Sequence, residues 1–455
     1  MSGGTSARGA ALEALRRTGR GPTFLRDDLH AIFDRTGLAP RDRALATQLA
    51  TGTVRHRRTL RRVLSHVRGD AGGAAAIQPD LRLILELGTF QLLFLDRVPA
   101  YAAVNEAVDE AGRAAGVKAA GFVNAMLRGV GRLIVGRDPD GDPACDALPH
   151  PEGGVVRLAA GVFADPAENR VAFLGAAYSY PDWLVGRWLD AFGDEAEAVC
   201  RWGNRRPRTF ARVNPMRHEA ADLLRTLQAE APGVVEGPRP GSLDVSALGA
   251  DRLETLIRDG DLTVQDPSAM AAVEALAPQA GETVLDLCAS PGTKTTQIVE
   301  AMGDGGVVVA ADRSDEKLRP LRRTVAARGM RSVTVCLSAE VGAAAPVAGF
   351  DAAVVDVPCS NTGVLARRVE ARWRLRPKDV PELVRLQTDL LCAAAACVGT
   401  GGRLVYSTCS LLRDENEGVV EAFLSGHRDW ALDEQDLILP GADHDGAFWA
   451  LIRRV

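Results

Sequence analysis

The chain has 455 residues, of which 46% are hydrophobic and 25% are charged, and its formal net charge is -5 at pH 7. This length is too great for one ordinary hydrophobic core, so we expect two or three domains. The charge excludes a globally basic nucleic-acid binder, and no apolar run reaches the roughly eighteen residues of a membrane span.

Residues 1–135 carry a helical pattern. Their first stretch, MSGGTSARGAALEALRR, lacks the apolar centre of a secretion signal, so we expect the protein in the cytoplasm, where thiols stay reduced. Apolar residues recur at intervals of three and four in ALEALRR, FLRDDLHAIF, ALATQLATGTVRHRRTLRRVL, DLRLILELGTFQLLFL and FVNAMLRGVGRLI. Gly and Pro separate these stretches. The pattern predicts a small all-helical bundle.

Positive charge is concentrated in one part of this bundle. Eight arginines and two histidines lie between Arg41 and Arg68, against a single acid, Asp42. On a helix, Arg55, Arg58 and Arg62 share one face. Two interpretations stay open: a solvated helix surface, or a stripe that contacts phosphates.

The middle of the chain divides into two segments. Residues 136–170 are rich in Asp, Gly and Pro without a period, which indicates a linker. Residues 171–264 combine an amphipathic helical pattern, PDWLVGRWLDAF, with the basic strand-like piece NRRPRTFARVNP and further short segments. This mixture predicts a small α+β module.

From residue 265 to 455, strand and helix patterns alternate. The apolar runs ETVLDLC, GVVVAAD, SVTVCL, FDAAVVDV and GRLVYST are separated by helical stretches such as TKTTQIVEAM and PELVRLQTDLLCAAAACV. Alternation of this kind predicts an α/β domain with a parallel sheet covered on both faces. Ligands bind at the carboxyl ends of such strands. The residues that fall there are Cys288, Asp312, Asp356 and Cys409.

The eight cysteines include no C-x-x-C pair, so we expect neither a metal site nor a disulfide framework. Most free cysteines are small buried apolar residues, which is our interpretation of Cys288, Cys336, Cys392 and Cys397. In VVDVPCSNTG and RLVYSTCSLLRDENE, however, Cys359 and Cys409 each end a strand among small polar residues. These two are candidates for chemistry.

The turn DLCASPGTKT follows a strand that ends in an acid, Asp286. A nucleoside-triphosphate loop needs glycine where Cys288 and Thr293 stand, so that interpretation fails, and no G-x-G-x-x-G is present. Asp312 ends the next strand, where an acid accepts hydrogen bonds from a ribose. An alternative is that Asp312 caps the following helix, although Ser314 or Asp315 could do so instead.

The motifs DLCASPGTKT, DVPCSNTGV and YSTCS, in this order on an alternating sheet, resemble those of the RNA cytosine-C5 methyltransferases of the RsmB/Sun type. PAYAAVNEAVDEA and GFVNAMLRGVGR resemble the last helices of the NusB-like RNA-binding domain of those enzymes, and the 171–264 module matches the place of their small RNA-binding domain. The resemblance covers nearly the whole chain outside the linker.

This resemblance implies S-adenosylmethionine as the cofactor. The residues expected to hold it are Cys288, Ala289, Ser290, Pro291, Gly292, Thr293, Lys294, Asp312 and Asp356. Two departures from the family pattern concern this site: Thr293 replaces a usual glycine, and CLSAE lacks the Asp expected near the adenine, so no adenine contact is assigned.

A thiolate that adds to cytosine C6 makes C5 nucleophilic, and it must later be expelled, which explains a need for two thiols. By the resemblance, Cys409 is the nucleophile, Cys359 assists product release, and Asp356 binds the cytosine N3/N4 edge as a protonated acid. Lys294 is expected to point towards Asp356. Basic residues and Trp373 in Leu365–Asp379 could contact phosphates and stack on a base, or form a solvated loop.

The expected activity is methylation of C5 of one cytosine in 16S rRNA, of the position-967 type, through a covalent Cys–C6 adduct. The NusB-like bundle favours rRNA over tRNA, which is the alternative substrate. A non-catalytic NusB-like RNA-binding or antitermination factor is the alternative of a different class. We expect a monomer.

Overall fold

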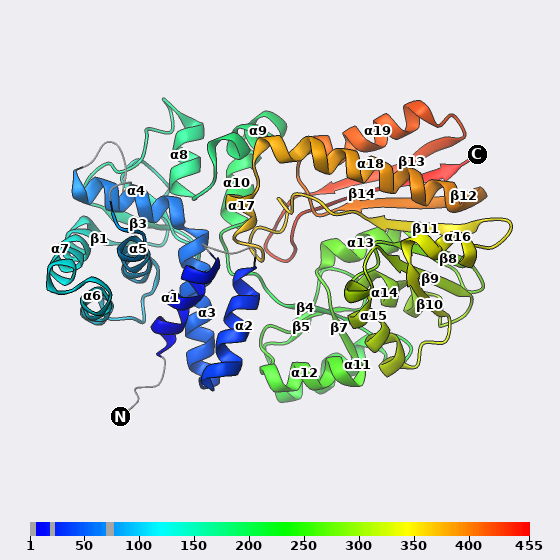
Figure 1. Ribbon diagram of the computed structural model, residues 1–455, viewed down its shortest axis with the longest axis horizontal. Helices are drawn as coiled ribbons and strands as arrows, with labels where there is room; N and C mark the ends of the chain where they lie inside the picture. The colour runs from blue at the N-terminus through cyan, green and yellow to red at the C-terminus, as the bar shows by residue number, and fades with distance from the viewer. Residues whose placement is uncertain (1–5, 19–22, 70–76) are drawn as a thin grey trace. The chain divides into compact units, whose positions relative to one another are not determined.

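The computed structural model describes residues 6–18, 23–69 and 77–455 (Figure 1). Residues 1–5 of the stretch considered for a secretion signal lie outside the described residues. The chain divides into two compact units, one of residues 1–206 with 365–374 and one of residues 207–364 with 375–455. This division falls at residue 206, whereas the sequence placed a boundary at 170. None of the described helices is long and apolar enough to cross a membrane.

The first unit begins with the expected helical bundle. α5 lies at its centre, since most of its residues are buried against neighbouring helices. Gly52 of α3 allows the closest approach, because a Cβ there would lie 2.0 Å from the ring of Phe90 on α5. The helices of the bundle are α1 (Ala7–Thr18), α2 (Leu25–Thr36), α3 (Pro40–Arg55), α4 (Arg57–Arg68), α5 (Pro79–Phe94), α6 (Ala100–Ala115) and α7 (Val117–Leu133).

The segment expected to be a linker contains regular structure. It forms an antiparallel sheet of order β1-β3-β2, built from β1 (Ile134–Asp138), β2 (Ala147–Pro149) and β3 (Val155–Leu158). Its Asp and Gly residues serve tight turns: a Cβ at Gly154 would lie 2.3 Å from the Asp138 carbonyl oxygen, and Asp138 pairs with Arg157 at 2.9 Å. Strands this short leave no period to detect. The unit continues with α8 (Arg170–Ala177), α9 (Asp182–Phe192) and α10 (Glu195–Trp202).

The second unit opens with the small α+β module. Its sheet has the order β5-β6-β4-β7 and packs α11 and α12 through Leu223, Leu227 and Leu256. The elements are β4 (Phe210–Val213), α11 (Ala220–Glu230), β5 (Val235–Glu236), β6 (Ser242–Asp244), α12 (Ala250–Asp259) and β7 (Leu262–Val264).

The α/β domain is built on a larger sheet of order β10-β9-β8-β11-β12-β14-β13. Five strands are parallel, which confirms the expected runs: β8 (Thr283–Leu287), β9 (Val307–Asp312), β10 (Val333–Leu337), β11 (Phe350–Asp356) and β12 (Val398–Thr408). Two further strands, β13 (Trp430–Ile438) and β14 (Ala447–Arg454), pair antiparallel and make the sheet mixed. Neither strand was among the expected runs. β13 is a largely exposed edge strand of polar composition, whereas β14 is apolar and mostly buried.

Helices cover both faces of this sheet (Figure 1). Leu285 and Val355 face α18 (Val380–Cys397) and α19 (Glu417–Gly426). Their neighbours Val284 and Val354 face α13 (Pro267–Leu276) and α14 (Thr293–Ala301) on the opposite side, which α15 (Asp315–Arg328) also covers. Burial on both sides explains the uninterrupted apolar runs. The carboxyl ends of the parallel strands therefore meet at one edge.

Short helical turns complete the two units. In the second unit these are η2 (Ser338–Glu340), α16 (Val341–Ala344), η3 (Pro377–Asp379) and η4 (Arg413–Glu415). α17 (Ala371–Arg374) belongs to the first unit, although the chain on either side of residues 365–374 belongs to the second.

Candidate active site

The structure brings the two candidate thiols together. Cys359 follows β11, Cys409 follows β12, and their Sγ atoms are 3.2 Å apart. Asn361 bridges the two loops, since its Nδ2 donates to the Cys359 carbonyl at 2.8 Å and its Oδ1 accepts from the Cys409 thiol at 3.4 Å. Asn361 has φ +61°, a left-handed conformation that asparagine tolerates better than most residues. The sequence analysis did not single out Asn361, although it lies two residues after Cys359.

The proton of the thiol pair belongs on Cys359. Its hydrogen bond to Cys409, its burial and the charges of Cys409 and Glu415 raise the pKa of Cys359 well above the ordinary range. Cys359 is therefore a thiol that donates to the Cys409 sulfur.

Lys294 points to Asp356, as expected, with Nζ 2.7 Å from Oδ2. Ser407 donates to the other carboxylate oxygen at 3.0 Å. Burial lowers the pKa of Lys294, but the charge of Asp356, with those of Asp286 and Cys409, outweighs burial and raises this pKa above its ordinary value. Lys294 and Ser407 thus occupy the two oxygens of the Asp356 carboxyl group, and the expected protonation of Asp356 stays a prediction.

Asp286, near the end of β8, is only 1% exposed. Its Oδ2 accepts a hydrogen bond from Thr295 at 2.5 Å, while its buried Oδ1 has no partner among the described residues. Burial raises the pKa of Asp286 to about 6. A buried carboxyl oxygen without a partner leaves one acceptor free at the sheet edge.

The turn from Cys288 to Lys294 is tied to β9. The backbone N–H groups of Cys288 and Ala289 both donate to the Ala311 carbonyl at 2.9 Å. Gly292 has φ +111°, and a Cβ there would lie 2.5 Å from Leu321, so only glycine fits. Thr293 then begins α14. The turn thus presents backbone and the start of a helix to the sheet edge, a local structure suited to close approach of a ligand.

The other cysteines fit the packing interpretation. Burial, followed by the charge of Asp312, raises the pKa of Cys288 to about 12, so this thiol is unreactive. Cys336 is buried in the sheet core, and Cys392 and Cys397 pack against the same core from α18.

Asp312 lies at the end of β9 and is 5% exposed. No hydrogen bond from the described residues reaches its carboxylate. Ser314 occupies the N-cap position of α15, so Asp312 is not the cap. In the CLSAE stretch, the Glu340 carboxylate accepts from the Leu337 backbone N–H at 2.8 Å and closes its own turn. Asp312 is therefore the acid that remains available for a ligand.

The three arginines of the proposed stripe have partners within the first unit. Arg55 donates to the Ala366 carbonyl at 2.8 Å, and Arg58 pairs with Asp182 at 2.7 Å. Arg62 is exposed, but its Nε donates to the Val162 carbonyl at 2.6 Å. Arg55 is therefore not a freely solvated side chain, and contact of the stripe with phosphates stays a prediction.

The basic segment after Cys359 also turns inward. Arg372 is 1% exposed, and the Trp373 indole donates to the Val54 carbonyl at 2.7 Å within the first unit. The Trp373 N–H is therefore used within the first unit, and stacking of its ring on a base stays a prediction. Arg367, Arg368, Arg376 and Lys378 of the same stretch are exposed.

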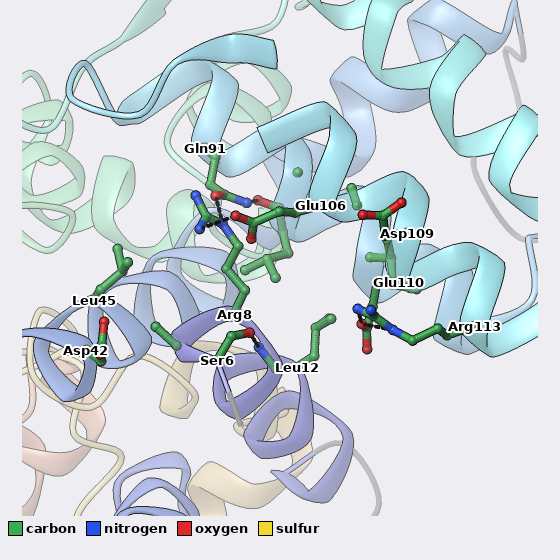
Figure 2. A pocket seen from close by; sticks show the side chains of 16 residues that line it. Ser6, Arg8, Leu12, Asp42, Leu45, Gln91, Glu106, Asp109, Glu110 and Arg113 are labelled. Atoms are coloured by element: carbon green, nitrogen blue, oxygen red, sulfur yellow. Dashed lines mark hydrogen bonds and ion pairs between the residues drawn. The ribbon is translucent and has the colours of Figure 1, made fainter. Parts of the chain in front are cut away.

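Figure 2 shows a separate cavity of about 430 Å³ in the first unit, between α1, α3, α5 and α6. Arg8 crosses it and donates to Gln91 at 2.7 Å and to Glu106 at 2.9 Å. Its lining holds none of the residues expected to react, so we place the candidate active site at the sheet edge. Within the part of the chain that the structure describes, no group of three or more His, Cys, Asp or Glu is arranged to hold a metal ion.

Comparison with known proteins gives matches in all three parts of the chain. The family model of 16S rRNA methyltransferase RsmB/F matches residues 273–445, the NusB family model matches 5–132, and the ferredoxin-like domain of Methyltr_RsmF/B-like proteins matches 180–240. The chain is 36% identical to "Probable ribosomal RNA small subunit methyltransferase B" of Synechocystis sp., over 93% of this chain and 90% of the relative. It is 31% identical to the Bacillus subtilis protein of the same name, over 96% and 91%.

Among solved structures, that of PH0851 has a TM-score of 0.75 and 23% identity and covers 100% of both chains. At this identity the likeness concerns the fold. It supports the fold of the helical bundle, the small sheet module and the α/β domain, each taken by itself.

Proposed function

The chain belongs to the RsmB/F family of 16S rRNA methyltransferases, and on this premise we propose that it transfers a methyl group from S-adenosylmethionine to C5 of one cytosine in 16S rRNA, of the position-967 type. The observation that carries the proposal is the pair of thiols at 3.2 Å, next to an ion-paired acid at the carboxyl edge of the sheet.

Cys409 is the nucleophile in this proposal. Its sulfur adds to C6 of the cytosine, which breaks the ring conjugation and leaves C5 as an enamine-like carbon. The Cys359 S–H and the Lys294 ammonium stabilise negative charge on Cys409 before attack. After methylation the Cys409–C6 bond breaks, and its release needs the C5 proton to leave. We assign Cys359 to this step: it gives its proton to the departing Cys409 sulfur and takes up the C5 proton in its place, while the C5–H electrons restore the C5–C6 double bond.

Asp356 and Lys294 position the base. The Asp356 carboxylate accepts from the cytosine N4 amino group, while Lys294 and Ser407 hold the carboxylate in place. A base at this position has left its stack, so a looped or splayed RNA segment is the natural substrate.

The same edge fits S-adenosylmethionine, which supplies the methyl group when bound. Asp312 has a carboxylate without a partner among the described residues, suited to the two ribose hydroxyls. The turn Cys288–Lys294, with its glycine at φ +111°, lets the ligand approach the backbone. Asp286 adds an unpartnered buried oxygen below the turn.

Substitution of the two cysteines tests the proposal. Cys409→Ala should lower methyl transfer by about a thousandfold or more, because the covalent step is lost. Cys359→Ala should instead accumulate a covalent protein–RNA adduct, because release is impaired. Methyl incorporation from labelled S-adenosylmethionine and a denaturing gel of protein with RNA measure the two effects.

Cys392→Ala is the matched control, because this partly buried thiol on α18 lies outside the site, and it should behave as the wild type. An active Cys409→Ala together with a Cys359→Ala that forms no adduct would show that the assignment is wrong. Absence of heat on calorimetric titration with S-adenosylmethionine would instead favour the non-catalytic RNA-binding factor.

Bisulfite sequencing identifies the substrate. Cells without the gene should lose one small-subunit rRNA cytosine mark, whereas loss of a tRNA mark alone would assign the protein to tRNA. We also propose that the enzyme acts as a monomer in the cytoplasm, which light scattering of the purified protein and cell fractionation check.

A further inference from the structure

Behind the two thiols lies a buried carboxylate that the mechanism above does not use. Glu415 ends η4, six residues after Cys409, and is 0% exposed. Its Oε1 accepts from the Ser360 backbone N–H and from Gln387 Nε2, both at 2.9 Å, and its Oε2 accepts from the Ser410 hydroxyl at 2.5 Å. One side chain therefore bonds to three separate segments.

These partners are the residues next to the thiols. Ser360 follows Cys359, and Ser410 follows Cys409, so Glu415 holds both loops at the positions directly after their cysteines. The Ser360, Thr362 and Ser410 hydroxyls also lie within 3.0–3.2 Å of one another. Gln387, on α18, donates to the Pro358 carbonyl at 2.9 Å and ties the same network to the helix that covers the sheet.

The charge of Glu415 is unusual for a purely structural group. No Lys, Arg or His among the described residues forms an ion pair with it. A buried carboxylate without a cation depends on its hydrogen-bond donors, and apolar side chains could pack two loops at a lower desolvation cost. The charge also lies near the thiols, where it is one of the causes that raise the pKa of Cys359.

We propose that Glu415 is a positioning residue of the reaction, which holds the Cys359 and Cys409 loops in register and whose negative charge disfavours a thiolate at Cys359. In this way Cys409 becomes the attacking sulfur and Cys359 retains its proton. The inference rests on the proposed function, because it concerns the division of roles between the same two cysteines.

Glu415→Gln tests the role of the charge while preserving shape. The amide oxygen still accepts from Ser360 and Gln387, and the amide nitrogen faces the Ser410 hydroxyl, so the loops stay connected. We expect kcat to fall by about tenfold or more, while KM for RNA and Kd for S-adenosylmethionine stay within about twofold. A residue that only stabilised the fold would not produce this separation of kcat from KM.

The adduct is the second measurement. Because Cys359 no longer assists release at the normal rate, Glu415→Gln should accumulate a covalent protein–RNA complex, as Cys359→Ala does. The double variant with Cys409→Ala should accumulate none. If Cys409→Ala alone remains active, the proposed function has failed; if it is inactive and Glu415→Gln has wild-type kcat without adduct, only the present inference has failed.

Glu421→Gln is the matched control, since Glu421 lies on the adjacent α19, is exposed and pairs with Arg413 at 2.7 Å. It should keep wild-type kinetics. An equal loss of kcat and of cofactor and RNA affinity in Glu415→Gln would overturn the positioning role. Should that variant fail to fold, Ser410→Ala decides: it removes one link and keeps the charge, and an unchanged kcat there would overturn the inference as well.

Discussion

The carboxyl groups at the sheet edge differ in hydrogen bonding and exposure, because each has different neighbours. Asp356 has an ammonium at 2.7 Å, Asp312 has no hydrogen bond from the described residues, and Asp286 has a single hydroxyl donor and almost no exposure. Asp286 is therefore costly to ionise, which its raised pKa of about 6 expresses. The protein retains it where an apolar residue would be more stable, as is common at functional sites.

Because buried Asp286 is costly to ionise, we expect the free energy of unfolding to depend on pH. Between the unfolded pKa of 3.8 and the folded pKa of about 6, the folded Asp286 binds more protons than the unfolded one, so stability falls as pH rises through this window. Asp286→Asn removes the ionisable carboxyl group, and its amide oxygen can still accept the hydrogen bond from Thr295. The variant should be more stable than the wild type by about 1–3 kcal/mol at pH 7.5, with a much smaller difference at pH 4. Urea unfolding at both pH values measures this.

Asp351→Asn is the control of opposite sign. Hydrogen bonds from the Thr283 backbone and hydroxyl lower the pKa of Asp351, so its charge stabilises the fold above the unfolded pKa and this gain is lost as pH falls. Asp351→Asn should therefore destabilise at pH 7.5. A loss of stability in Asp286→Asn at pH 7.5 would contradict our account of that residue.

At the scale of elements, the segment 365–374 shows how a basic sequence can serve packing. The guanidinium carbon of Arg372 lies 4.2 Å from the ring centroid of Tyr180. The guanidinium donates to the carbonyls of Arg55, Ser179, Gly203 and Leu365 and to the side chain of Asn204. Glu370 accepts from the Leu25 backbone N–H at 2.8 Å. The segment is an integral part of the first unit, although it follows the loop that carries Cys359.

Removal of the Arg372 side chain should strongly destabilise the fold. Arg372→Ala leaves several buried acceptors without a donor, and one such group costs about 1–3 kcal/mol, so we expect a loss of about 3 kcal/mol or more. Equilibrium denaturation with guanidinium chloride measures it. Arg368→Ala, at an exposed position in the same segment, should change stability by less than about 0.5 kcal/mol. Equal effects of the two variants would contradict this expectation.

At the scale of the whole molecule, each unit combines parts of different architecture. In the second unit, Arg212 of the small sheet reaches Glu300 of α14 at 2.8 Å, and Arg328 of α15 reaches the same carboxylate at 3.1 Å. All three side chains are less than one tenth exposed. The triad joins the small module to the α/β domain through α14, the helix that begins at Thr293.

Glu300→Gln should weaken the contact between the small module and the α/β domain. The substitution leaves two buried guanidiniums without a countercharge, and loss of one partner of a buried ion pair costs about 3–5 kcal/mol. We expect a lower midpoint and a less cooperative transition in calorimetry. Glu274→Gln, in the partly exposed pair with Arg239, is the control and should cost less than about 1 kcal/mol. A Glu300→Gln midpoint equal to that of the control would contradict the role of the triad.

Local pattern was enough to predict the parallel part of the large sheet and its reactive edge. The runs at β8, β9, β11 and β12 are apolar because both faces are buried, and the carboxyl ends of parallel strands share one edge. The expected place of Cys359 and Cys409 at strand ends followed from these runs, and so did the place of Asp312 and Asp356. The same patterns were uninformative for β13, whose exposed residues carry no apolar period.

The contact between the two thiols and the burial of Arg372 depend on residues that are distant in the sequence. The two sulfurs lie 3.2 Å apart, and Glu415 bonds to Ser360 and Ser410, the residues that follow the two cysteines on separate loops. The inward turn of Arg372 depends on carbonyls of residues far away in the sequence. The amino-acid sequence by itself determined the elements and the edge at which they end, because periodicity is local. Only the tertiary structure decided which charges are buried and which groups they meet, because desolvation and hydrogen bonding depend on neighbours that the pattern does not reveal.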